Sequence, residues 1–407
     1  MSPLHALRKP AASDAASVPS RDQLFARAEA LAADLTARGA ELDRDGQPPS
    51  AEIAALKAGG LLNALHDPKI GGGGLGWVDG LRLTRILARG ESSIGQLLGY
   101  HYVNSQYVLW AVADADKARR IAQETVEKSL YWGAAVNPRD PGLTLTREGD
   151  HFRLNGRKSF STGARISDWI NVGATLDDRI AQFAVPTDRA GYIAHDDWDN
   201  IGQRLSDSGS VEFRDFPVYE SDFLFAPTAP DAPADVRASF NTPLIQLVFA
   251  NFYIGTAEGA LDTALDYVRT TTRPWITSGV ERAADDPHIL ERVGEFRASL
   301  RAAAALADVA AEAVETALVR PGVTARERGE AAIAAYESKV NATHVSLEIT
   351  SRIFELMGAR ATAGRHRFDR YWRNVRTHTL HDPVFYKARE VGDFALNDRI
   401  PPVSLYS

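Results

Sequence analysis

The residues best suited to chemistry lie near the C-terminus, in residues 370–383 (RYWRNVRTHTLHDP). This segment holds three arginines, two histidines three positions apart and one aspartate. Groups of this kind must each be solvated, paired or ligated, so packing alone does not account for their density. Two chemistries fit the segment. Asp382 could be the base of a dehydrogenase, or His378 and His381 could belong to an oxygenase pocket, because imidazole titrates near working pH and can donate or position a proton.

Other chemistries are not expected. His378 and His381 have the spacing of a metal-binding pair, but no third ligand is apparent, so we expect no metal site. The chain has no cysteine, which excludes disulfides, Cys-ligated zinc, iron–sulfur clusters and thiol nucleophiles. Residues 71–74 (GGGG) lack the Gly-Lys-Ser/Thr of a phosphate-binding loop, so we expect a chain turn bordering the pocket.

Three blocks of sequence must position these side chains. Residues 21–128 have apolar residues at helical spacing, residues 129–225 alternate between apolar and polar, and residues 237–407 return to long helical patterns. The Pro- and Ala-rich residues 226–236 have the composition of a linker. We therefore expect an α+β fold with an N-terminal helical domain, a small middle β-barrel or sandwich and a C-terminal helical bundle.

Local signals predict some of the boundaries. Thr324 and Glu327 have the spacing of a capping box that begins a helix over residues 325–357. A second helix is predicted over residues 288–318. Residues 154–157 (LNGR) predict a β-hairpin turn, because Asn-Gly is the strongest signal for a two-residue turn.

Composition restricts the partners. The chain of 407 residues is 44% hydrophobic and 24% charged, which is typical of two or three packed globular units. A net charge of −7 argues against nucleic acid and against an anionic membrane surface. No apolar run reaches the roughly 20 residues of a membrane span, and residues 1–20 lack the apolar stretch of a secretory signal. We expect a cytoplasmic protein with a disordered start.

The order of the blocks and several local sequences resemble the acyl-CoA dehydrogenase superfamily. Residues 71–76 (GGGGLG) resemble the glycine-rich turn of its N-terminal domain, and residues 158–163 (KSFSTG) resemble a segment that packs against the flavin. Residues 201–213 resemble the strand that closes its β domain, and residues 373–380 (RNVRTHTL) resemble the Arg-Asp-x-Arg segment before the active-site loop. The resemblance covers nearly the whole chain. It implies the acyl-CoA dehydrogenase-like fold, with a middle β-barrel domain and a C-terminal four-helix bundle that ends in an active-site tail.

The match fails where these dehydrogenases carry their base. The resemblance implies a glutamate in a Tyr-Glu-Gly-Thr turn, where this chain has Asp382 followed by Pro383. Aspartate is one methylene shorter, and proline stiffens the turn, so the reach to a substrate proton is reduced. Some members place the base on the helix that corresponds to residues 244–255, which here lacks the expected acid and arginine. An acyl-CoA dehydrogenase that uses Asp382 is the weaker alternative.

Longer stretches resemble dibenzothiophene monooxygenase and its relatives, which are two-component enzymes on the dehydrogenase fold. These stretches are residues 98–104, 196–202, 206–210, 272–275 and 368–383. The resemblance implies that a separate NAD(P)H-flavin reductase supplies reduced FMN by diffusion, with FMN favoured over FAD. It implies a C4a-hydroperoxyflavin that oxygenates an organosulfur compound, such as dibenzothiophene, to a sulfoxide or sulfone. Hydroxylation of carbon or nitrogen in an aromatic or amine substrate remains an alternative, as does a catalytically silent flavin-binding scaffold.

The same resemblance implies the site residues. The catalytic candidates are His101, His378, His381, Ser161 and Thr162. The cofactor-binding candidates are Tyr100, Asn137, Phe160, Ser161, Thr162, Trp198, Ser208, Ser210, Arg273, Arg360, His378 and Asp382. The three histidines are expected to converge and to position the proton that the reaction needs.

Two groups of these candidates have specific expected roles. Phe160 occupies the place of the flavin-stacking residue of the family. Arg273 and Arg360 are expected to grip the FMN phosphate, since a guanidinium group binds phosphate in a bidentate manner. In the family one such arginine reaches the flavin of a neighbouring subunit, which implies a homotetramer (a dimer of dimers) or at least a dimer. Substitution of His101 or His381 by alanine is expected to keep the fold and flavin binding but to divert oxygen into peroxide.

Overall fold

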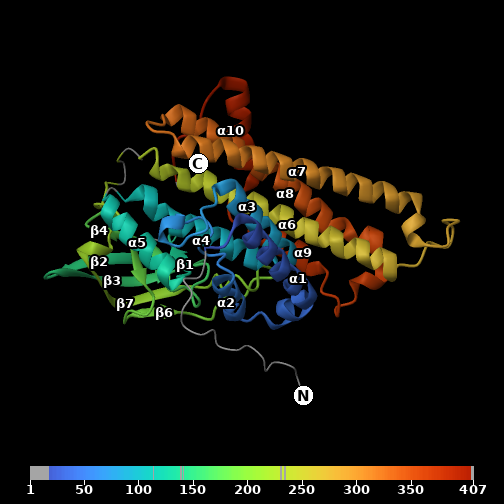
Figure 1. Ribbon diagram of the computed structural model, residues 1–407, viewed down its shortest axis with the longest axis horizontal. Coiled ribbons are helices and arrows are strands. Elements are labelled where there is room, and N and C mark those ends of the chain that lie inside the picture. The colour runs from blue at the N-terminus through green and yellow to red at the C-terminus, as the bar shows by residue number, and fades with distance from the viewer. Residues whose placement is uncertain are drawn as a thin grey trace, which may run out of the picture.

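The computed structural model describes residues 18–112, 114–137, 140, 142–229, 232 and 235–404. Most of the expected disordered start, residues 1–17, lies outside the described residues, as do residues 230, 231, 233 and 234 of the expected linker. Long helices run side by side across the molecule, and a sheet lies at one end of them (Figure 1).

The N-terminal part of the described chain is helical. It contains α1 (Arg21–Asp45), α2 (Ser50–Ala58), α3 (Trp77–Gly90), α4 (Ser92–Ala111) and α5 (Ala115–Lys128), with a 3-10 turn at Pro68–Ile70. Helix α1 begins at a capping box in which Ser20 and Gln23 satisfy each other's main-chain N–H groups. Helix α4 is buried on nearly all sides because it runs between the sheet and the bundle, and almost every residue up to Val108 is buried.

A curled seven-stranded sheet forms the middle of the chain. Its strands are β1 (Trp132–Ala135), β2 (Leu143–Glu148), β3 (His151–Lys158), β4 (Trp169–Leu176), β5 (Arg179–Pro186), β6 (Tyr192–Ala194) and β7 (Val211–Val218). The order is β1-β4-β2-β3-β7-β6, and β5 pairs with β4. Alternate residues such as Phe152, Leu154, Phe213 and Phe216 point inward and form one apolar core. The alternation that predicted strands in this block is the alternation of that core.

The predicted hairpin turn at residues 154–157 is wrong. These residues lie inside β3, which pairs with β2 on one side and β7 on the other. Gly156 has φ +125°, and the register between β3 and β7 shifts between Leu154 and Gly156, which is a β-bulge. A Cβ at Gly156 would lie 1.5 Å from the Gly142 carbonyl oxygen. Asn-Gly here bends a strand, and the turn between β2 and β3 is at Gly149.

The C-terminal part is a bundle built around α6 (Asn241–Thr270), α7 (Pro287–Val319) and α8 (Ala325–Met357), followed by α9 (Asp369–His378) and α10 (Val384–Asn397). The capping box of Thr324 and Glu327 is confirmed at the start of α8. Helix α6 contacts α3, α4, α7, α8 and α9. The loop over residues 271–286 lies at the end of the bundle opposite to the sheet (Figure 1).

Among the described residues, one helical stretch resembles a membrane span, and most of it is helix α6. Residues Ala238–Thr270 are long and apolar enough to span a membrane, but 89% of the apolar window is buried inside the protein. The helix is therefore the core helix of the bundle.

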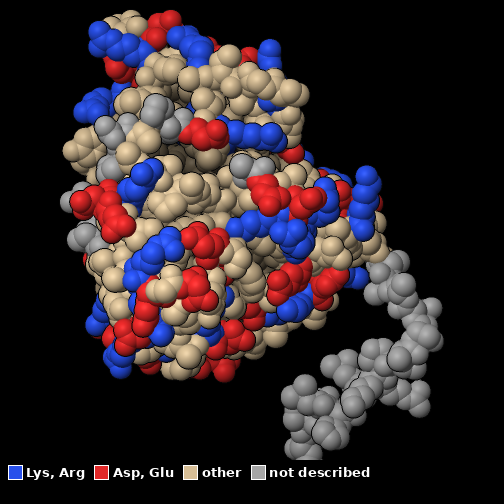
Figure 2. Space-filling model, turned by 90° about the vertical axis from the view of Figure 1, so that its left-hand side faces the viewer, with Lys and Arg blue, Asp and Glu red and all other residues tan. Residues whose placement is uncertain are grey.

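On the face formed by the sheet end, acidic and basic side chains are interspersed (Figure 2), so no large field of one sign covers this side.

Candidate active site

The two C-terminal histidines lie together where α9 ends. His378 is the last residue of α9 and is buried. The hydroxyl oxygen of Tyr100 lies 2.9 Å from its Nε2, and the hydroxyl oxygen of Tyr253 lies 2.7 Å from its Nδ1. Burial, together with the nearby His381 and Lys339, lowers the pKa of His378 well below its usual range, so the ring is neutral near pH 7. A neutral imidazole donates from one nitrogen and accepts at the other, so one tyrosine donates to the ring and the other accepts from it.

His381 stacks on His378 and faces outward. The two rings are nearly parallel, with an angle of 9° between their planes and 5.3 Å between their centroids. The Phe249 ring lies against both, at 4.6 Å from His378 and 5.0 Å from His381. The side chain of His381 is 44% exposed. It is therefore the imidazole through which solvent or a ligand can reach the pair.

Asp382 is a buried carboxylate that is already paired. Its Oδ1 lies 2.5 Å from Lys339 Nζ and 3.2 Å from His381 Nδ1, and Gln246 Nε2 lies 3.4 Å from its Oδ2. Burial raises the pKa of Asp382, but the hydrogen bond from His381 and the charge of Lys339 outweigh burial and lower it below the usual range. Asp382 is thus ionised and held. We call Tyr100, Tyr253, His378, His381 and Asp382 the imidazole cluster.

A second group of side chains lies where β3 and β7 meet the helices. Thr162 Oγ1 lies 2.9 Å from Ser208 Oγ, and Ser206 Oγ lies 2.7 Å from the same atom. Ser161 Oγ is buried and has no hydrogen-bond partner among the described residues. Such an orphaned hydroxyl marks a place where a ligand or water can bind. We call Ser161, Thr162, Ser206 and Ser208 the hydroxyl cluster.

Two aromatic rings stand beside the hydroxyl cluster. Phe160 has φ +53° and is 63% exposed, which is unusual for a phenylalanine. Its ring meets the ring of Trp198 edge to face at 6.0 Å, and the indole N–H of Trp198 donates to the Gln203 carbonyl oxygen over 2.8 Å. Together the two rings present an aromatic surface next to the unpaired hydroxyl of Ser161. This combination suits a planar ring system with polar edges.

The loop that carries Trp198 is fastened to the helix that carries His378. The main-chain N–H of Gln203 donates to Asn374 Oδ1 over 2.7 Å, and its side chain donates to Ser92 Oγ over 3.0 Å. Arg373 donates to the Ile201 carbonyl oxygen over 2.6 Å. Asn374 lies one turn before His378 on α9. The loop between the two clusters is therefore held to α9 by hydrogen bonds.

His101 lies apart from the other two histidines, although the sequence predicted that all three converge. Its Nε2 lies 2.9 Å from the Leu62 carbonyl oxygen, and its Nδ1 accepts from the Trp132 main-chain N–H over 3.1 Å. Its ring stacks on Tyr131, with 5.6 Å between centroids. Burial lowers the pKa of His101 to about 3. Each ring nitrogen has a main-chain partner, so His101 ties α4 to two other segments of the chain.

Asn137 and Ser210 are held by the protein itself. The side-chain amide of Asn137 lies 3.4 Å from Ser159 Oγ. Ser210 Oγ accepts from Arg157 over 2.9 Å and donates to Asp197 over 2.6 Å. These contacts are with protein side chains that flank the hydroxyl cluster, so they hold the surrounding loops in place.

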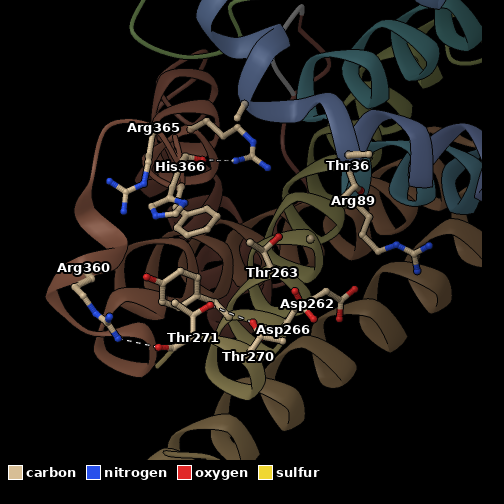
Figure 3. A pocket seen from close by; sticks show the side chains of 16 residues that line it. Thr36, Arg89, Asp262, Thr263, Asp266, Thr270, Thr271, Arg360, Arg365 and His366 are labelled. Atoms are coloured by element: carbon tan, nitrogen blue, oxygen red, sulfur yellow. Dashed lines mark hydrogen bonds between the residues drawn. The ribbon is translucent and has the colours of Figure 1, made fainter. Parts of the chain in front are cut away.

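Arg273 and Arg360 lie at the other end of the molecule. Arg360 donates to the Thr271 carbonyl oxygen over 2.8 Å and lines a cavity of about 670 Å³ together with Arg365 and His366 (Figure 3). Arg273 is exposed on the loop that follows α6. Figure 1 places this loop at the end of the bundle opposite to the sheet, whereas the hydroxyl cluster follows β3 and precedes β7 of that sheet.

Residues of the site that escaped the sequence analysis include Tyr253, Phe249 and Lys339. The first two lie on α6 among other buried aromatic residues, and their types alone did not distinguish them from core. Lys339 carried a usable signal. It stands on α8 at a position where the neighbouring turns have buried residues such as Ala335 and Ala342, and a charge in an apolar stripe needs a partner.

Known proteins are similar to this chain over almost its full length. The models for the middle and the C-terminal domain of acyl-CoA dehydrogenases match residues 134–216 and 247–384. The chain is 38% identical over 395 residues to a probable FMNH2-dependent monooxygenase, SfnC, of Pseudomonas putida, covering 96% of this chain and 98% of that protein. It is 38% identical to a dibenzothiophene monooxygenase of Mycolicibacterium goodii, covering 89% and 90%. The crystal structure of TdsC from Paenibacillus sp. A11-2 with FMN and indole superposes with a TM-score of 0.91 at 37% identity, covering 95% of this chain and 100% of TdsC.

Proposed function

This chain belongs to the flavin-dependent monooxygenases of the acyl-CoA dehydrogenase superfamily, and on that premise we propose that it uses reduced FMN and O₂ to oxygenate a small organosulfur compound. The observation that carries the proposal is the imidazole cluster. A neutral, buried His378 is held between two tyrosine hydroxyls next to the more exposed His381. Such a chain of groups can hold and pass a proton in a pocket from which water is largely excluded.

The residues present fit the ring system of a flavin mononucleotide. Ser161 Oγ is an orphaned buried hydroxyl, and Phe160 and Trp198 offer aromatic faces beside it. In the proposal these residues, with Thr162 and Ser208, hold the ring system. When bound, reduced FMN supplies the electrons that activate O₂, so that one oxygen atom goes to the substrate and the other to water.

The protein's own contribution is to manage a proton and to exclude water. Both nitrogens of His378 are bonded to hydroxyl groups, and a hydroxyl can donate or accept. A proton taken up at one nitrogen can therefore be matched by release at the other through Tyr100 or Tyr253. The Phe249 and Phe252 rings pack against His378 at 4.6 and 4.7 Å and keep that side dry. A dry site limits the loss of oxidising equivalents as peroxide.

The arrangement of Asp382 speaks against the dehydrogenase alternative. A base that abstracts a proton next to a thioester must be free to reach it. Asp382 is instead buried, bonded to Lys339 and His381, and held ionised. Hydroxylation of an aromatic ring is the second candidate, because the related TdsC structure contains both FMN and indole.

We infer further that the active enzyme is a homo-oligomer, a tetramer in the simplest case, in which Arg273 or Arg360 grips the FMN phosphate bound to a neighbouring subunit. Arg273 lies on the loop over residues 271–286, to which Arg360 is bonded through the Thr271 carbonyl, and this loop lies at the end of the bundle opposite to the sheet. This place at one end of the molecule supports a contribution between subunits. In this proposal the enzyme is cytoplasmic and receives reduced FMN by diffusion from a separate reductase. A mixed oligomer tests the inference. Thr162→Val and Arg273→Ala variants are each expected to be impaired, and their co-expression is expected to restore part of the activity, which variants that act within one chain would not do.

The function itself is tested by mixing the protein and anaerobically reduced FMN with oxygenated buffer and dibenzothiophene or indole. We expect oxygenated product in proportion to O₂ consumed, with little peroxide. Product from indole alone would favour the second candidate. Peroxide without product, together with bleaching of bound FAD by an acyl-CoA, would overturn the proposal in favour of a dehydrogenase.

A further inference from the structure

Lys339 is a buried ammonium group beneath the imidazole cluster. It lies in the middle of α8 and is only 1% exposed. Its Nζ lies 2.5 Å from Asp382 Oδ1 and 4.9 Å from the centre of the Phe249 ring. Taking an ammonium and a carboxylate out of water costs several kcal/mol for each ion, and their mutual attraction offsets that cost only when the geometry is good. Apolar residues of similar size would fill this position without that cost.

The lysine and His381 meet at one oxygen atom. Asp382 Oδ1 is bonded to Lys339 Nζ at 2.5 Å and to His381 Nδ1 at 3.2 Å. Because an ionised carboxylate only accepts hydrogen bonds, the His381 nitrogen that faces it must carry the proton. The other nitrogen, Nε2, is then free to accept a proton on the exposed side of the ring. Asp382 thus sets the tautomer and direction of His381, and Lys339 fixes the position and charge of Asp382.

We propose that Lys339 is a positioning residue, which acts through Asp382 to hold His381 in the Nδ1–H tautomer against His378 and to moderate the pull of the carboxylate on that ring. The inference rests on the proposed monooxygenase function and adds a residue to its site. A carboxylate that acted on His381 alone would retain the protonated imidazolium more strongly. The buried ammonium removes part of this attraction, so His381 can release the proton that it takes up.

Other charged and titratable groups surround this unit on each packed element. His378 stacks on His381 from α9, and the hydroxyls of Tyr100 and Tyr253 bond to His378 from α4 and α6. On α10, Lys387 Nζ lies 2.9 Å from Glu390, and these two groups lie close enough to Lys339 to act on it electrostatically. Burial lowers the pKa of Lys339 to about 8. The moderation of Asp382 is therefore expected to weaken above about pH 8.

The alternative is a purely structural role, in which Lys339 only holds the segment after α9 in place through Asp382. Lys387 offers a matched control, because it is also a buried lysine near the same turn, it is paired with Glu390, and its Nζ lies 3.9 Å from the centre of the Tyr336 ring. Replacement of either lysine by methionine removes a buried ammonium and keeps most of the side-chain volume. A purely structural role predicts that the two substitutions behave alike.

The test compares Lys339→Met, Lys339→Arg and Lys387→Met. Hydrogen–deuterium exchange at the imidazole C2 position, read by mass spectrometry on the protein without flavin, reports the titration midpoint of His381. We expect Lys339→Met to raise this midpoint by about one pH unit, because an opposite charge nearby favours the protonated ring. With reduced FMN, O₂ and dibenzothiophene, the same variant is expected to make roughly one-tenth as much product per O₂, because a misplaced proton-transfer group is less effective. Lys339→Arg should restore most of the coupling. Lys387→Met removes an ammonium that acts on Asp382 only from a distance, so it should shift the midpoint much less than Lys339→Met does.

The outcomes separate the two proposals. An unshifted His381 midpoint in Lys339→Met, or an equal shift in Lys387→Met, overturns the positioning role. If the wild-type protein makes no product from any substrate, the proposed function fails, while the exchange measurement still decides whether Lys339 controls His381.

Discussion

Two buried histidines, His101 and His378, differ in the kind of partner that holds them. Each ring is buried and has both nitrogens in hydrogen bonds. The partners of His101 are main-chain groups, the Leu62 carbonyl and the Trp132 N–H. The partners of His378 are tyrosine hydroxyls. The difference decides which imidazole can take part in proton transfer.

Main-chain partners cannot exchange their roles. A carbonyl only accepts and an N–H only donates, so His101 must remain neutral with its proton on Nε2. A protonated ring would point a second N–H at the N–H of Trp132. A hydroxyl can donate or accept, so the tyrosines around His378 can satisfy more than one protonation state. A buried histidine is thus available for chemistry when its partners are side chains that can reverse their roles.

The largest test of this comparison is His101→Ala. The variant leaves a cavity in the core and two main-chain groups without partners, so we expect the free energy of unfolding to fall by about 3–5 kcal/mol. This differs from the expectation from sequence, which was an intact fold with peroxide leakage. Urea denaturation of the flavin-free protein measures the loss, with His381→Ala as the exposed control. Unchanged stability combined with peroxide leakage would return His101 to the list of catalytic residues.

In contrast to His101→Ala, His378→Gln should lower activity strongly and stability only slightly. Glutamine keeps polar atoms within reach of the tyrosine hydroxyls, but it cannot take up a proton near pH 7. We expect product formation to fall about 100-fold, which is about 2.7 kcal/mol, while stability changes by roughly 1 kcal/mol. Product yield and peroxide are measured together with reduced FMN and dibenzothiophene. A variant that unfolds as readily as His101→Ala would erase the distinction between the two histidines.

The sequence predicted the fold better than it predicted the site. The order of helical, alternating and helical blocks follows from periodicity, and the capping box at Thr324 is a local pattern that no distant contact can change. The Asn-Gly at residues 155–156 led to the wrong prediction of a hairpin turn. A turn and a β-bulge both use a glycine with positive φ, and only the pairing of β3 with β7 distinguishes them.

The site depends on contacts that are distant along the chain. The sequence found His378, His381 and Asp382 because they are dense in one segment. It did not find Lys339 or Tyr253, whose partners are 43 and 125 residues away. It could not separate His101 from His378 either, since the main-chain partners of a side chain have no signature in its own sequence. The roles of Arg273 and Arg360 stay predictions, because they depend on an arrangement of subunits.

The free energy of unfolding should decrease at acidic pH because the buried imidazoles do not take up protons in the folded protein. Burial lowers the pKa of His66 to about 4, whereas an unfolded histidine titrates near 6.5. Between these values the unfolded chain binds a proton that the folded chain does not, so stability falls as the pH drops below 6.5. The expected slope is about 1.4 kcal/mol per pH unit for each such histidine. His66→Gln should lower the slope by that amount in denaturation curves between pH 6 and 5, and an unchanged slope would contradict the neutral buried state.

The smallest expected effect belongs to the two hydroxyls that distinguish His378. Tyr253→Phe and Tyr100→Phe each remove one hydrogen bond to the ring, which costs about 1 kcal/mol of stability. If role reversal by hydroxyls is what makes His378 useful, each variant should also lower product per O₂ by roughly fivefold, since a remaining single hydroxyl cannot both supply and receive the proton. The double variant should then lose no more coupling than His378→Gln. Full coupling in both single variants would mean that burial alone, and not the reversible partner, separates His378 from His101.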